Sequence, residues 1–158
     1  MIEAWFSALG EPLADEERRE IAGYLAGLGM DAPMPVQLMK SWHEARHTCR
    51  APSDEWWRAE EDERARFERA ARLDPADPEW LALNVALHGA AAVAAARAGR
   101  ADAALIRVAA GAASYAAYQA RLARVAGAVN VHPFLRKYAL YCGGRWPLGI
   151  YHGQFAIF

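Results

Sequence analysis

Alanine makes up about half of residues 90–128, and this stretch constrains the fold more than any other part of the chain. Alanine is the strongest helix former, and its small side chain lets the backbones of neighbouring helices approach closely. Gly99 interrupts the stretch, and glycine commonly ends a helix. We therefore predict two long helices, over residues 78–98 and 102–126, packed as a tight hairpin.

Capping residues and helix breakers predict further helices along the chain. Acids follow Ala14, Ser53 precedes a charged stretch, and Asp77 precedes Pro78. Serine and aspartate are favoured N-caps, and proline is tolerated at the first helical position. Asp74 and Pro75 begin the turn before Asp77. The remaining helices are expected over residues 15–27, 36–50, 54–73 and 132–142.

The last residues of the chain change in character. Gly143 and Gly144 stop the preceding helix, and residues 145–158 have the composition of β-strands. His152 and Gly153 separate two apolar runs, which predicts a two-residue hairpin turn. The predicted fold is an all-α single domain over residues 1–158, a bundle of five to six helices arranged as stacked helical hairpins. Residues 143–158 form its small C-terminal β-hairpin, or an extended lid.

Aromatic residues crowd into this C-terminal region, beside three basic residues. We expect these rings to pack as a lid over the open end of the helical bundle. Two alternatives stay open, because aromatic and arginine side chains also anchor protein interfaces and stack on single-stranded nucleic acid. The rings are Phe134, Tyr138, Tyr141, Trp146, Tyr151, Phe155 and Phe158.

Charged residues are distributed unevenly along the chain. Residues 1–79 contain 18 of the 19 acids and 10 of the 18 basic residues, a formal charge of −8. Residues 80–158 contain one acid, Asp102, and eight basic residues, a balance of +7. Either the two halves pack together and neutralise each other, or one stays exposed and steers a partner of opposite charge. The eight basic residues are Arg97, Arg100, Arg107, Arg121, Arg124, Arg136, Lys137 and Arg145.

No catalytic set is evident, so we interpret the protein as a non-enzymatic protein-binding module. The sharpest form of this hypothesis is an inhibitor or immunity-type protein that neutralises a bacterial toxin by occlusion, with the acidic half steering it toward a basic toxin domain. A second alternative is nucleic-acid binding through the basic half. The expected contact face lies on the helix over residues 54–73 and comprises Asp54, Glu55, Trp56, Trp57, Glu60, Glu61, Asp62 and Glu63.

His43, Glu44 and His47 match the H-E-x-x-H pattern, in which two histidines one helical turn apart bind zinc and the glutamate acts as a general base. The match resembles the zincin metallopeptidases and implies, as the alternative function, a zinc-dependent hydrolase. It departs from that family because Arg46 places a cation beside the metal position and no strand-rich segment precedes the helix. A bundle-type metal site would add His88, His132, Cys49 or Cys142. We expect no cofactor.

Residues 67–75, followed by residues 78–81, resemble the end of one tetratricopeptide repeat and the start of the next. The resemblance implies that Phe67 and Ala70 pack between helices. Residues 99–105 also resemble the inner turn of such a repeat, but they lie about two helical turns too far along the chain. No third copy follows. Stacked helical hairpins of this kind mostly bind proteins.

Composition limits the remaining classes of protein. A hydrophobic content of 54% in 158 residues excludes a disordered chain and is sufficient for one core. Two cysteines exclude a disulfide framework, and the opening residues lack the basic region of a secretory signal. We expect a cytoplasmic protein that does not enter a membrane, since Asn84, His88 and several arginines interrupt the two apolar helices.

Overall fold

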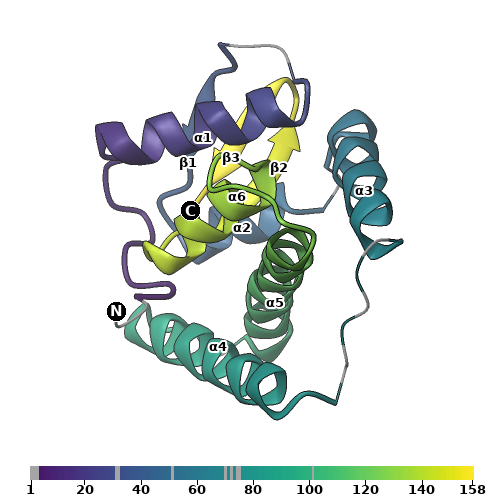
Figure 1. The fold of residues 1–158 in the computed structure, drawn as a ribbon. Coiled ribbons are helices and arrows are strands. Elements are labelled where there is room, and N and C mark those ends of the chain that lie inside the picture. Colours follow the sequence, from purple (N-terminus) through teal and green to yellow (C-terminus); the bar gives the residue numbers. More distant parts are fainter. Residues whose placement is uncertain are drawn as a thin grey trace.

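The computed structural model describes residues 4–30, 33–50, 52–69, 71, 73, 76–100 and 102–158. Helices dominate, and three short strands form one sheet (Figure 1). The predicted fold class, a helical bundle with a small C-terminal β segment, is confirmed. In chain order the elements are α1 (Asp15–Gly27), β1 (Val36–Leu38), α2 (Trp42–Thr48), α3 (Asp54–Glu68), α4 (Pro78–Arg97), α5 (Ala103–Val125), α6 (Pro133–Cys142), β2 (Pro147–Tyr151) and β3 (Gln154–Ile157).

The alanine-rich hairpin forms as expected from α4 and α5. The Asp77 carboxylate accepts a hydrogen bond from the Glu79 backbone N–H at 2.9 Å, and Pro78 occupies the first turn of α4. Asp102 caps α5 by accepting from the backbone N–H groups of Ala104 and Leu105. The facing sides are built from small buried residues, so the two helices lie close together. These residues are Ala91, Ala95, Ala109, Ala113 and Ala116.

The short helix α6 lies at the centre of the fold. It packs against α1, α5 and β2, and most of its side chains are buried, including Phe134, Leu140 and Lys137. A helix that is buried on nearly all sides is normally apolar throughout. Lys137 is the exception, and its charge must be balanced inside the protein.

The three strands form a mixed sheet in the order β1-β3-β2. The hairpin of β2 and β3 is antiparallel and turns at His152 and Gly153, whose φ angles of 50° and 74° are those of the predicted two-residue turn. All seven C-terminal aromatic rings are buried, which confirms that they pack inside the protein. For example, Trp146 and Phe158 both contact Trp42 of α2.

Two expectations about helix boundaries are wrong. The helix predicted over residues 36–50 begins at Trp42, because Val36–Leu38 instead forms β1 and pairs in parallel with β3. The helix predicted over residues 54–73 ends at Glu68. Asp74 and Pro75, part of the expected turn, lie outside the described residues.

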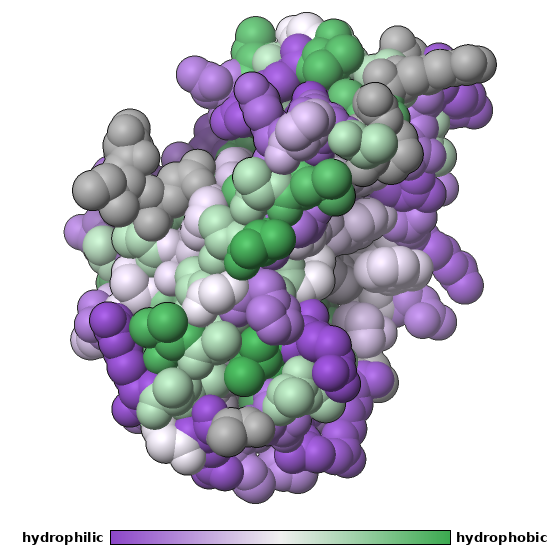
Figure 2. Space-filling model, turned by 90° about the horizontal axis from the view of Figure 1, so that it is seen from below, coloured by the Kyte–Doolittle hydropathy of each residue, from purple (hydrophilic) through white to green (hydrophobic). Residues whose placement is uncertain are grey.

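One side of α4 is apolar and faces solvent. Leu81, Val85 and Val93 are about half to three-quarters exposed, and Figure 2, which views the molecule from below, shows apolar surface on this side. Among the described helices, α4 has the length and apolarity that would suffice to cross a membrane, and 17% of the segment is buried. Its packing partner α5 therefore covers only part of its apolar surface.

Candidate functional site

A buried ion pair joins α3 to α6. Lys137 Nζ lies 2.7 Å and 2.8 Å from the two carboxylate oxygens of Glu60. Glu60 is 0% exposed and Lys137 is 5% exposed. Burying either charge alone would be very unfavourable, so each residue requires the other.

Three further side chains complete the hydrogen bonds of this pair. The Tyr24 hydroxyl donates to Glu60 at 2.5 Å and accepts from Trp56 Nε1 at 2.7 Å. The Gln119 carbonyl oxygen accepts from Lys137 Nζ at 3.2 Å. Burial raises the pKa of Tyr24 well above its usual value, and the negative charge of Glu60 raises it further. Tyr24 therefore stays protonated and remains a hydrogen-bond donor.

A pocket of about 280 Å³ opens above the ion pair. Lys137 Nζ lies 5.5 Å from the ring centroid of Trp56 and 5.9 Å from that of Tyr115, so the rings contribute cation–π contacts. An ammonium group has three donors, and Glu60 and Gln119 occupy all three. The aromatic walls of the pocket are Trp56, Trp57, Tyr115, Tyr141, Trp146 and Tyr151.

The outer rim of this aromatic pocket is formed by Trp57 and Tyr115. Trp57 is 47% exposed, and its ring stacks on that of Tyr115 with centroids 6.5 Å apart. The Tyr115 hydroxyl donates to Glu61, which also accepts from Arg64 at 2.8 Å. The hydrogen bonds from Arg64 lower the pKa of Glu61 and outweigh the opposing effect of partial burial. Glu61 is therefore ionised beside exposed aromatic surface, and Arg64 pairs with its charge.

The structure does not bring the eight predicted contact residues onto one surface. Trp56 and Glu60 are buried, so the expectation that they belong to an exposed face is not met. Their i, i+4 spacing places both on the inner side of α3. Glu63 bonds to His132 at 2.9 Å and to Arg66 at 2.6 Å.

The remaining predicted contact residues divide between two sides of α3. Asp54, Trp57 and Glu61 share one side, next to the pocket, because they are spaced i, i+3, i+7. Glu55 and Asp62, also seven residues apart, lie on another side, and both are exposed. Of the eight predicted contact residues, a single partner surface on the pocket side can therefore include only Asp54, Trp57 and Glu61.

Within the described part of the chain, four of the eight basic residues of the C-terminal half pair with acids of the N-terminal half. Lys137 pairs with Glu60, and the other three pairs join separate elements across the fold. The charge split along the sequence is thus partly neutralised inside the fold, as one of the two interpretations allows. The other pairs are Arg145–Glu17, Arg136–Glu20 and Arg121–Asp77.

The H-E-x-x-H residues lie on the exposed surface of α2. The rings of His43 and His47 are in contact, with centroids 4.4 Å apart. The Glu44 carboxylate accepts a hydrogen bond from the Lys40 backbone N–H at 2.9 Å, so it contributes to the start of α2. No third histidine, cysteine or carboxylate completes a metal site with them among the residues that the structure describes. His132, a further candidate, instead caps α6.

Sequence reasoning missed Tyr24, Gln119 and Lys137 as parts of this site. Two signals were present. Glu60 follows Trp56 by one helical turn, which places an acid on the apolar side of α3. Lys137 is one of only two lysines in the chain and lies within an apolar helix. An acid and a cation that each lie on a buried helix side are candidates to pair.

The comparisons with known proteins supply no relative for this fold and site. No family model, no curated protein and no solved structure matches the chain. The class that the fold defines is a helical bundle completed by a small mixed sheet. Any function therefore has to be argued from the site itself.

Proposed function

We propose that this protein is a non-enzymatic binding module that receives an apolar or aromatic side chain of a partner protein in the aromatic pocket beside α3. The observation that carries the proposal is the half-exposed Trp57 at the mouth of a pocket with aromatic walls. Binding energy in protein interfaces concentrates in tryptophan, tyrosine and arginine side chains that fill desolvated pockets.

The size and chemistry of the pocket favour an anchoring side chain over a small-molecule substrate. Its volume of about 280 Å³ lies just below the range of roughly 300–1,000 Å³ that is typical of small-molecule sites. The polar groups at its floor are bonded to one another, because Lys137 donates to Glu60 and Gln119. The pocket therefore presents mainly apolar surface to whatever enters it.

The charges at the rim favour a partner that is basic around its anchor. Asp54 and Glu61 lie on the same side of α3 as Trp57. Glu61 is paired with Arg64, whereas the exposed Asp54 forms no ion pair with a described residue, and a carboxylate beside an interface increases the association rate of a basic partner. A finer form of the proposal is an inhibitor or immunity-type protein that occludes a basic toxin domain. Asp54, the acid of this side that no described cation pairs with, supports this form.

The test begins with identification of a partner by affinity capture from the cells in which the protein is expressed. The purified partner is then titrated against the wild-type protein and against Trp57→Ala. We expect the Kd to increase at least tenfold, because truncating an interface tryptophan commonly costs about 2 kcal/mol or more. Ala112→Phe, which fills the pocket from α5, should weaken binding similarly.

Two control variants match these changes. Leu81→Ala removes a comparably exposed side chain from α4 and should leave the Kd unchanged. Asp54→Lys should lower the association rate and its salt dependence, whereas Asp62→Lys on the other side of α3 should not. Capture of no protein, or a Kd that Trp57→Ala and Ala112→Phe leave unchanged, would contradict the proposal.

A further inference from the structure

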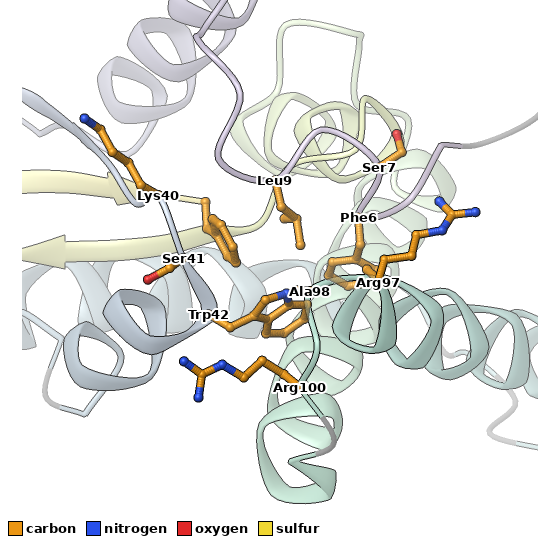
Figure 3. A pocket seen from close by; sticks show the side chains of 11 residues that line it. Phe6, Ser7, Leu9, Lys40, Ser41, Trp42, Arg97, Ala98 and Arg100 are labelled. Carbon is orange, nitrogen blue, oxygen red and sulfur yellow. The ribbon is translucent and has the colours of Figure 1, made fainter.

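A second pocket, of about 390 Å³, lies beside the start of α2. The aromatic pocket lies beside the other end of α2, at Cys49, and the two pockets share no lining residue. The N-terminal loop, the start of α2 and the C-terminal end of α4 form its walls. Figure 3 shows apolar side chains gathered at its middle, with three long cationic side chains around them. We call it the cationic pocket. Its lining residues are Phe6, Ser7, Leu9, Lys40, Ser41, Trp42, Ala94, Arg97, Ala98, Arg100 and Phe158.

The floor of the cationic pocket is aromatic and closely packed. Phe6, Trp42 and Phe158 are each 3% exposed, and the rings of Trp42 and Phe158 meet edge to face at 5.6 Å. Phe6 has a φ of 59°, a conformation that bulky residues rarely adopt. Such strain costs about 1–3 kcal/mol and concentrates at functional sites. The fold thus places the Phe6 ring at this pocket at the expense of backbone strain.

The rim of the cationic pocket is positively charged. Lys40, Arg97 and Arg100 are exposed, and Figure 3 shows their charged ends extending in different directions from the rim. None of the three forms an ion pair with a described residue, and no aspartate or glutamate is among the described lining residues. Long cationic side chains keep their stems on apolar surface and can move their charged ends to meet an anion.

We propose that the cationic pocket binds a small anion that carries a flat apolar ring, such as an aryl phosphate or an aryl carboxylate. The ring packs on Phe6, Trp42 and Phe158, and the anionic group lies at the rim, where Arg97, Arg100 and Lys40 turn their charged ends toward it. The volume lies within the range of roughly 300–1,000 Å³ that small-molecule sites occupy. Guanidinium groups suit phosphate and carboxylate because they donate two parallel hydrogen bonds.

The test uses three probes that combine a ring with an anionic group: adenosine 5′-monophosphate, 2-naphthyl phosphate and indole-3-acetate. Binding is measured by titration calorimetry at low salt, with adenosine and inorganic phosphate as the ring-only and charge-only controls. We expect at least one probe to bind with a Kd below 1 mM, at least tenfold more tightly than either control. The double variant Arg97→Gln/Arg100→Gln should weaken that binding at least tenfold.

Two further variants separate the pocket from the surface charge. Arg107→Gln/Arg124→Gln removes two exposed arginines of α5 outside the pocket and should leave probe binding unchanged. Ala98→Trp fills the mouth of the pocket without removing a charge and should abolish it. Failure of all three probes at 1 mM, or binding that survives Ala98→Trp, would overturn the inference. Neither result bears on the aromatic pocket beside α3.

Discussion

Glu60 and Lys137 are 77 residues apart in the sequence and form a buried ion pair, with Nζ 2.7 Å from one carboxylate oxygen and 2.8 Å from the other. The pair joins α3, at the edge of the fold, to the central helix α6 (Figure 1). Both members of the pair also line the aromatic pocket, whose rim carries Trp57.

Removing either member of this pair should strongly destabilise the fold. We expect Glu60→Gln and Lys137→Met each to lower the free energy of unfolding by about 3–5 kcal/mol, since the first leaves the ammonium and the second the carboxylate uncompensated in the interior. The double variant Glu60→Leu/Lys137→Met should recover most of the loss. Urea unfolding followed by circular dichroism measures all three.

An exposed ion pair provides the control for this prediction. Arg46 and Asp102 lie 2.7 Å apart, but the Arg46 side chain is 56% exposed. Exposed pairs contribute about 0–1 kcal/mol, so Arg46→Gln should change the free energy of unfolding by no more than that. Equal effects of Arg46→Gln and Glu60→Gln would contradict the assignment of Glu60 as a buried, paired charge.

The stability of the protein should decrease in acid partly through Glu17. Arg145, which is 3% exposed, donates to Glu17 at 2.6 Å and 3.0 Å. Burial opposes ionisation of Glu17, but the hydrogen bonds from Arg145 and from the Ala14 N–H outweigh it and lower the pKa below the ordinary value of 4.5. A carboxyl with a lowered pKa stabilises the fold above its unfolded pKa and loses this contribution as the pH falls through the folded pKa.

Glu17→Gln should therefore reduce the slope of stability against pH below about pH 4.5. The measurement is urea unfolding at a series of pH values between neutral and acidic. Glu16→Gln, at an exposed neighbouring position on α1, is the matched control and should leave the slope unchanged. The prediction fails if the wild-type protein and Glu17→Gln show the same dependence on pH.

Gly144 should tolerate substitution much less well than Gly153, although both have positive φ angles of 96° and 74°. A Cβ at Gly144 would lie 2.8 Å from the Ala8 backbone nitrogen and 3.0 Å from the Ala4 backbone oxygen, whereas at Gly153 it would meet nothing within 4 Å. Gly153→Ala should cost about 1–2 kcal/mol from backbone strain alone, and Gly144→Ala about 1–3 kcal/mol more from overpacking. Thermal unfolding of the two variants checks the order.

Elements with local signals could be predicted from the sequence, and elements that depend on distant partners could not. Asp77 with Pro78 and Asp102 specify the starts of α4 and α5 within a few residues of chain. In contrast, Val36–Leu38 becomes a strand only because β3 lies beside it, more than 100 residues later in the sequence. Three residues carry too little periodicity to distinguish a strand from the start of a helix.

The candidate site was only partly predictable for a related reason. Glu60, Glu61 and Glu63 are alike in sequence, and which of them faces inward depends on how α3 is rotated against α5 and α6. Trp57 was predicted as a contact residue and lies half-exposed at the pocket, while its role in binding a partner stays a prediction. Spacing on a single helix identifies the possible inner sides, but only tertiary packing selects one of them.

Zinc binding by His43 and His47 should be weak. The two rings lie together on α2, but no third ligand joins them among the described residues, and the Glu44 carboxylate accepts a hydrogen bond from the Lys40 N–H. Structural zinc sites use four protein ligands, and catalytic sites use three plus a water. Elemental analysis of protein purified without added metal should therefore give well below one zinc per chain, and His47→Ala should not change this value. One zinc per chain, lost in His47→Ala but retained in His88→Ala, would instead favour the hydrolase alternative and contradict a non-enzymatic role.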